Sequence, residues 1–176
     1  MKTLRRLNRA VLATACVTLI ITTDSLKADL HPVNIAPIHA NAGVTAVLTN
    51  TSDPLVFIAT ATGVVQTSLL GTCVENAQLE VHFASTPGQP AVLTGTSTFT
   101  SIDGTKSLNT SVSGTATPDP ANPGFLNARY QVTFTGGTGP FASASGFGEI
   151  TEVAMFTSQT TATVTWTLNG LVITPR

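Results

Sequence analysis

Residues Thr161 to Leu168 read TATVTWTL, in which polar and apolar side chains alternate at every step. Because successive side chains of a β-strand point to opposite faces, this alternation predicts a strand that is buried on one face only. Four threonines form the polar face, and the apolar face is made of Ala162, Val164, Trp166 and Leu168. Threonine is β-branched and favours strands, so composition and pattern point to the same structure.

The same alternation recurs through the rest of the chain. It predicts further strands at residues 44–49, 55–65, 79–83, 92–102, 106–116, 126–135 and 146–156. Asp103-Gly104 separates two of these strands and is a strong hairpin signal. Asn169-Gly170 is compatible with a last hairpin and equally with a glycine bulge in one long strand. No amphipathic helical segment of useful length occurs between the strands.

About eight short strands with regular turn signals are typical of an all-β fold. We expect a single antiparallel β-barrel over residues 44–176, with a β-sandwich as the alternative. Residues 29–43 contain Pro32 and Pro37 and are expected to form an extended arm before the first strand.

The first 28 residues have the pattern of a secretory signal peptide. A basic stretch precedes Ala10–Thr23, which is uncharged and would span only about 21 Å as a helix. Ala28 is a plausible last residue before cleavage. We therefore expect a secreted or periplasmic protein with no stable membrane insertion after cleavage. A lipid anchor on Cys16 and an uncleaved membrane anchor are the alternatives.

The chain after residue 28 carries few charges, which limits its partners. Eight acidic residues stand against three basic ones, Lys106, Arg129 and Arg176, so the net charge is −5. Nucleic-acid binding requires clustered basic residues, and this composition argues against it. Cys73 is the one remaining cysteine in this part of the chain, so no disulfide is expected to stabilise the domain.

A glycine-rich stretch carries a resemblance to a known group. Residues 136–148 read GGTGPFASASGFG. This is similar to the GGTGRFAGASGxG signature of secreted bacterial all-β proteins of the allene oxide cyclase-like and dirigent-like barrel group. Residues 99–115, FTSIDGTKSLNTSVSGT, resemble that group's FTxxxGDxLxGxxxGT hairpin, whereas Pro140 replaces its usual basic residue. The resemblance implies an eight-stranded antiparallel barrel with a central cavity.

The glycines of this motif have a physical explanation that does not require a ligand. Gly136, Gly137 and Gly139 allow positive φ and close backbone approach in a crossing loop. Phe141 is then expected to plug one end of the barrel, and Gly146 to let the returning segment lie against its neighbours. We predict a structural role for these residues.

Few side chains are candidates for chemistry. Glu149 and Glu152 are three residues apart in one strand and therefore face opposite sides, so that one of them can enter the barrel. A carboxyl group inside an apolar barrel has a raised pKa and can act as a general acid. Tyr130 and Glu149 are the catalytic candidates. Surface glutamates and a core tyrosine are the simpler interpretations. Tyr130, Trp166 and Phe134 are the candidates for ligand binding.

Glu80 and His82 share one strand face and form a weaker candidate. They could act as an acid/base pair or as two metal ligands, but no third ligand accompanies them. A solvated strand face is the simpler interpretation. The sequence thus predicts no metal site and no cofactor.

Three functional hypotheses follow, the first of which is non-enzymatic. In the first, the barrel binds an apolar small molecule. In the second, suggested by the resemblance, it is an isomerase or cyclase, which converging ionisable side chains in the cavity would favour. In the third, the alternating threonines of residues 94–100 and 161–167 bind ice or a polysaccharide surface. Ligand and oligomeric state are not determined by the sequence.

Overall fold

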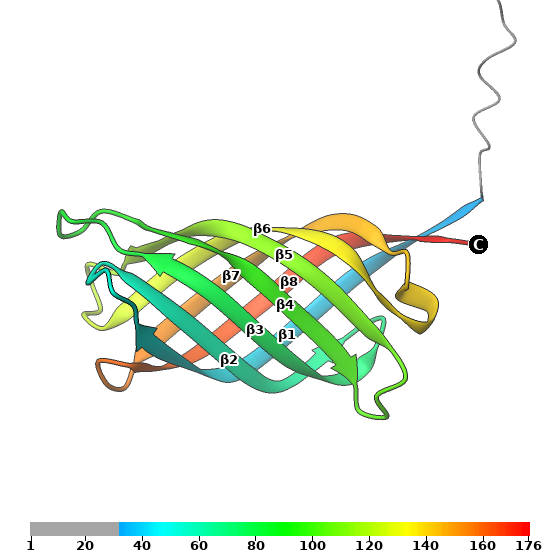
Figure 1. The fold of residues 1–176 in the computed structure, drawn as a ribbon, viewed down its shortest axis with the longest axis horizontal. Helices are drawn as coiled ribbons and strands as arrows, with labels where there is room; N and C mark the ends of the chain where they lie inside the picture. Colours follow the sequence, from blue (N-terminus) through cyan, green and yellow to red (C-terminus); the bar gives the residue numbers. More distant parts are fainter. Residues whose placement is uncertain (1–31) are drawn as a thin grey trace, which may run out of the picture. The chain divides into compact units, whose positions relative to one another are not determined.

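The computed structural model describes residues 32–176, and they form a closed antiparallel barrel (Figure 1). The predicted signal peptide lies outside the described residues. The eight strands are β1 (Val33–Asn50), β2 (Val56–Thr67), β3 (Gly71–His82), β4 (Ala91–Ser101), β5 (Ser107–Pro118), β6 (Phe125–Thr138), β7 (Ser145–Phe156) and β8 (Thr161–Pro175). In this part of the chain no helix is long and apolar enough to cross a membrane.

Each strand pairs with the next one along the chain, and β8 returns to pair with β1. This closure confirms the predicted barrel and excludes the sandwich. The alternation has the expected cause: inward side chains are mostly apolar and buried, whereas Thr163, Thr165 and Thr167 face outward. Within residues 32–176, each strand therefore has a partner on both sides over most of its length, and the backbone groups are paired around the barrel.

The predicted arm is wrong for residues 33–43, which form the first half of β1. This segment pairs with β8 from Val33 opposite Pro175 onward, whereas its pairing with β2 begins only at Ala40. Pro37 lies on the stretch without a β2 partner. The N–H of His39, which points to the same side as the proline nitrogen, bonds the Ser68 hydroxyl instead of β8. The missing N–H of Pro37 therefore costs no hydrogen bond to β8.

Two turn predictions have different outcomes. The hairpin at Asp103-Gly104 is confirmed, although only Gly104 has a positive φ, at 70°. The Asp103 carboxylate holds this loop by accepting hydrogen bonds from Ser101 Oγ and from the N–H of Thr105. Asn169-Gly170 is neither hairpin nor bulge, because β8 runs through it in regular register with both neighbours.

The glycine-rich motif forms the connection between β6 and β7. Gly136, Gly139 and Gly146 have positive φ, and the 3-10 turn η2 (Gly139–Phe141) lies between the strands. Gly137 has no positive φ, but a Cβ there would lie 2.0 Å from the Ser107 carbonyl oxygen. Phe141 is buried within the hydrophobic core.

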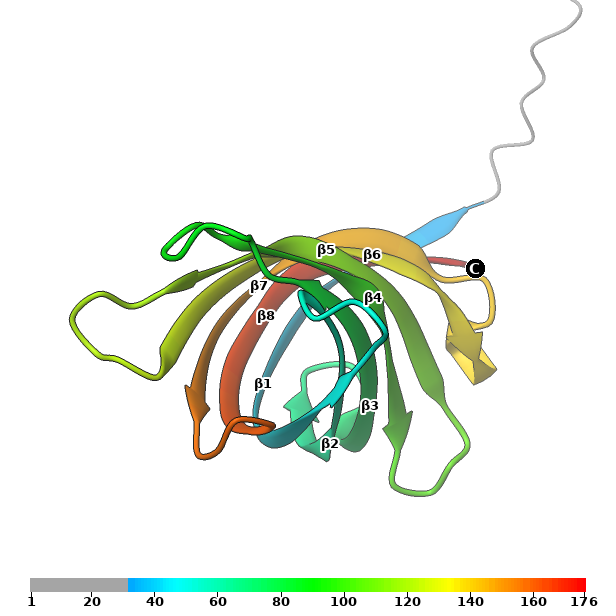
Figure 2. The same ribbon diagram turned by 60° about the vertical axis from the view of Figure 1, so that its left-hand side comes forward.

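The two ends of the barrel are filled differently. One end of the barrel carries the β2–β3, β4–β5 and β6–β7 connections (Figure 1). Large side chains fill the lumen there, and we call it the packed end. Its fully buried members include Ile38, Val65, Phe99, Leu108, Phe134, Leu168 and Val172. The other four connections surround the opposite end, which we call the mouth (Figure 2). The inward residues nearest the mouth are Leu48, Phe83, Leu93, Leu126 and Phe156.

Candidate functional site

The mouth half of the lumen contains a cavity of about 90 Å³. Small side chains leave this space, because many of the inward positions here are alanines: Ala46, Ala59, Ala61, Ala77, Ala116, Ala154 and Ala162. An engineered apolar cavity of about 150 Å³ holds benzene, so this one fits a smaller molecule or one end of a larger molecule. Phe83, Leu126 and Phe156 are only partly buried, which places the outer limit of the cavity near solvent.

Five polar or aromatic side chains meet on the cavity wall, between the alanines and the packed end. We call them the lumen cluster: Glu75, Ser97, Tyr130, Glu152 and Trp166. They come from five strands, β3, β4, β6, β7 and β8. Each is in phase with the apolar inward residues of its own strand, and barrel closure brings them together.

Glu75 is the more enclosed of the two carboxyl groups in the cluster, with a relative exposure of 4%. The Ser97 hydroxyl donates a hydrogen bond of 2.9 Å to its Oε1, and the indole Nε1–H of Trp166 donates one of 3.2 Å to its Oε2. Burial raises the pKa of the Glu75 carboxyl, while these two donors act in the opposite direction by favouring the ionised form. The contact with Trp166 crosses the lumen from β8 to β3.

Glu152 forms a second pair with Tyr130. The phenol donates a hydrogen bond of 3.1 Å to Oε1 of Glu152, and among the described residues it is the only donor to that carboxylate. Burial, the largest cause, and the charge of Glu75 raise the pKa of Glu152 to about 7, although the bond from Tyr130 lowers it. Burial and the Glu152 charge likewise raise the pKa of Tyr130. Near neutral pH the Glu152 carboxyl can therefore both donate and accept a proton.

The structure separates the residues singled out by the sequence. Tyr130 and Trp166 belong to the lumen cluster, whereas Phe134 is 2% exposed, packs at the packed end and does not line the cavity. The choice of Glu149 as the inward carboxylate is wrong. Its side chain points out of the barrel, 3.6 Å from the Arg129 guanidinium, because it is out of phase with buried Ile150 and Ala154. Glu152 takes the inward position instead.

Glu75 and Ser97 were not identified from the sequence, although a signal was present. Glu75 is two residues from Ala77 and four from Leu79, and so it continues the inward face of β3. Ser97 stands in the same relation to Phe99 on β4. Extending the apolar alternation through polar positions would have placed both side chains in the lumen.

The remaining candidates lie outside the cavity. Glu80 and His82 contact each other at 2.5 Å on the outer face of β3. Within residues 32–176 no group of three metal-ligating side chains occurs. Cys73 is fully buried beside the cluster, and burial raises the pKa of its thiol.

The threonine ladders lie on the outer wall. Thr151 and Thr167 hydrogen bond across β7 and β8 at 2.8 Å, and with Thr165 they line a surface hollow that also includes Arg129. This surface follows the curvature of the barrel, which makes it a poor match for a flat ice or polysaccharide face.

Fold and site together define the class of molecule as a closed eight-stranded antiparallel β-barrel with a polar cluster inside a partly empty apolar lumen. Comparison of the chain with protein-family models, with curated proteins and with solved structures finds no match.

Proposed function

We propose that this chain is an exported small-molecule-binding barrel whose lumen accepts an apolar molecule through the mouth. The observation that carries the proposal is the contrast between the two halves of the lumen. One half is packed with large side chains, whereas the other contains a cavity whose lining includes seven alanines and a polar wall. Small-molecule sites typically combine apolar walls with a few polar groups that orient the ligand.

The dimensions limit the ligand. A cavity of about 90 Å³ is below the roughly 300–1,000 Å³ of sites for drug-sized molecules. A ligand with a small ring or a short chain fits, and so does a longer one whose end enters the mouth past Phe83 and Phe156. Burial of its apolar surface contributes roughly 25 cal/mol per Å².

Trp166 supplies a direct assay, because it is the only tryptophan of the chain and it lines the cavity. We expect its fluorescence to change on titration with small aromatic and aliphatic compounds, and native mass spectrometry to detect one-to-one complexes. Ala59→Leu fills the lumen and should abolish both signals. Thr60→Leu is the matched control, because the next residue of β2 faces outward. Binding that survives Ala59→Leu would contradict a lumen site.

A second candidate function is that of an isomerase or cyclase. The observation that supports it is that the hydrogen-bonded Tyr130–Glu152 pair adjoins the cavity. Burial raises the pKa of Glu152 to about 7, which fits a role in proton transfer. The resemblance of the glycine-rich motif to the allene oxide cyclase-like and dirigent-like barrel group points the same way. By itself, likeness of fold is weak support for an activity.

The two functions differ in what happens to a bound molecule. A catalyst converts it into an isomer of equal mass with a different chromatographic retention. Tyr130→Phe and Glu152→Gln should then stop conversion but retain binding, because both substitutions preserve shape. If ligands are recovered unchanged after long incubation, the catalytic function is contradicted and only the binding function remains.

Export rests on the N-terminal residues. The basic stretch followed by Ala10–Thr23 supports cleavage after Ala28. N-terminal sequencing of protein recovered outside the cytoplasm should begin at Asp29. Recovery of the uncleaved chain in the membrane fraction would support the anchor instead.

A further inference from the structure

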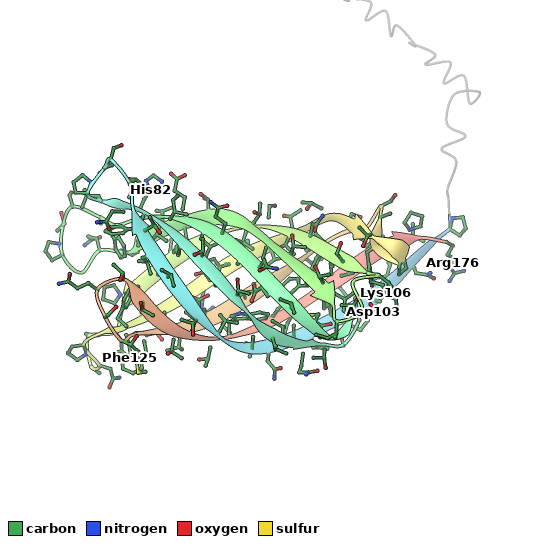
Figure 3. The ribbon with its side chains drawn as sticks, turned by 60° about the horizontal axis from the view of Figure 1, so that its bottom comes forward. His82, Asp103, Lys106, Phe125 and Arg176 are labelled. Atoms are coloured by element: carbon green, nitrogen blue, oxygen red, sulfur yellow. The ribbon has the colours of Figure 1, made fainter. Side chains whose placement is uncertain are left out.

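The lumen has an unbalanced set of ionisable groups. Two carboxyl groups, Glu75 and Glu152, line the cavity, and no basic side chain of the described residues does so. Lys106 and Arg176 lie at the packed end, opposite His82 and Phe125 (Figure 3). The side chain of Arg129 is 80% exposed on the outer face of β6. Within residues 32–176, no cationic side chain therefore lines the cavity beside these carboxyl groups.

We propose that the ligand of the lumen is a small organic cation, an apolar body that carries a protonated amine. This inference rests on the proposed binding function and names the chemical class that the cavity selects. An ionised carboxyl group in an apolar interior is costly unless it is paired with a cation or well hydrogen-bonded. A protonated amine supplies the missing charge, and its hydrocarbon body matches the alanine-lined wall.

The hydrogen-bonding capacity of the cluster fits an ammonium group. An ammonium offers three donors and no acceptor. Glu75 uses each oxygen for one bond, to Ser97 and Trp166, and each oxygen retains a second lone pair. Glu152 accepts one bond at Oε1, from Tyr130, and no described residue donates to its Oε2. The acceptors on the cavity wall therefore outnumber the donors already bound to them, as a donor-only ligand requires.

Aromatic rings border the same space. Trp166 and Tyr130 both line the cavity, and a cation near the face of such a ring gains electrostatic attraction. The indole of Trp166 is held by its bond to Glu75 and by an edge-on contact with Phe99, at a centroid distance of 6.0 Å. A ring held on two sides loses little further freedom when a ligand binds.

The proposal predicts a pH dependence with a definite sign. The titratable groups on the inward faces are Glu75 and Cys73 on β3, Tyr130 on β6 and Glu152 on β7. The pKa of Glu152 is raised to about 7, so below that pH an amine must compete with a proton for the carboxylate. Below this pKa, proton competition at one site weakens binding about tenfold per pH unit. Because pH 5 lies about two units below it, the affinity should fall about a hundredfold from pH 8 to pH 5.

The decisive experiment compares ligands of nearly equal shape on the intact protein. The probes are two pairs: n-butylamine with 1-butanol, and benzylamine with benzyl alcohol. Their binding is measured by Trp166 fluorescence and by calorimetry from pH 5 to pH 8. We expect each amine to bind at least tenfold more tightly than its alcohol at pH 8, with the preference lost at pH 5. Glu152→Gln should reduce the preference and its pH dependence, whereas Glu149→Gln, on the outer face of the same strand, should change neither.

The outcomes separate this proposal from the binding function on which it rests. Alcohols that bind as tightly as amines at pH 8 would overturn the cation proposal and leave the apolar binding function in place. If neither amines nor alcohols bind, both fail. The comparison of amine with alcohol in the unmodified protein requires no variant, so a misfolded glutamine variant would not remove the test.

Discussion

Glu152→Gln should make the barrel more stable at pH 8 and leave its stability nearly unchanged at pH 5. The pKa of the carboxyl rises from its ordinary value of 4.5 to about 7 in the folded protein, mainly through burial. The folded state therefore holds the proton more tightly than the unfolded state. The stabilisation from this group is fully present below pH 4.5 and is lost as the pH rises through about 7.

The size of the effect follows from the same values. At about 1.4 kcal/mol per pH unit, ionised Glu152 destabilises the fold by roughly 3 kcal/mol above pH 7. The side chain is only partly buried by area, so solvent screening brings the expected value nearer 2 kcal/mol. Glutamine keeps the oxygen that accepts the Tyr130 hydrogen bond and carries no charge. The free energy of unfolding of the variant should therefore exceed that of the original protein by about 2 kcal/mol at pH 8.

Urea unfolding between pH 5 and pH 8, followed by Trp166 fluorescence, measures this difference. Glu149→Gln makes the same chemical change on the outer face, so comparing the two variants isolates the buried position. If the stability of Glu152→Gln tracks that of the original protein at every pH, the carboxyl group is well solvated. The assignment of Glu152 to the lumen cluster would then be refuted.

Three further predictions concern packing and the cluster. Phe99→Ala should lower the free energy of unfolding by about 3–5 kcal/mol in urea titrations, because this fully buried ring fills the packed end. Gly114→Ala should lower the free energy of unfolding by at least ~2 kcal/mol, since its Cβ would lie 2.0 Å from a carbonyl oxygen of β6. Gly43→Ala, with open space around it, should be neutral or stabilising. Equal effects of the two substitutions would contradict this account. Tyr130→Phe should move the pH midpoint of the stability change upward, because it removes the donor that lowers the Glu152 pKa; an unchanged or lower midpoint would count against that bond.

The period-two alternation was sufficient to predict the barrel. Each of the eight expected segments overlaps a strand of the structure, because inward and outward positions carry different side chains even in short segments such as residues 79–83. The prediction failed where alternation was absent. Pro32 and Pro37 interrupted the pattern at the start of β1, and only the long pairing with β8 makes that segment a strand.

The candidate site was predicted less completely, for a different physical reason. The inward position of a residue depends on local phase, so Tyr130 and Trp166 could be placed, and consistent use of phase would have chosen Glu152 over Glu149. Which inward residues meet in the lumen depends on how the barrel closes and on how far its strands are staggered. Trp166 bonds Glu75 across 91 positions of sequence, and no local pattern relates the two.

The pairing of β1 with β8 also determines how the chain can be rearranged. Every other pairing joins strands that are consecutive in sequence, while this one brings the two ends of the described chain together, with the Arg176 N–H bonded to the Pro32 carbonyl at 2.9 Å. A short linker between these ends, with new termini opened in an exposed hairpin loop such as residues 102–106, would preserve every strand pair. Such circular permutants should close into the same barrel with β1 and β8 joined as an ordinary neighbouring pair.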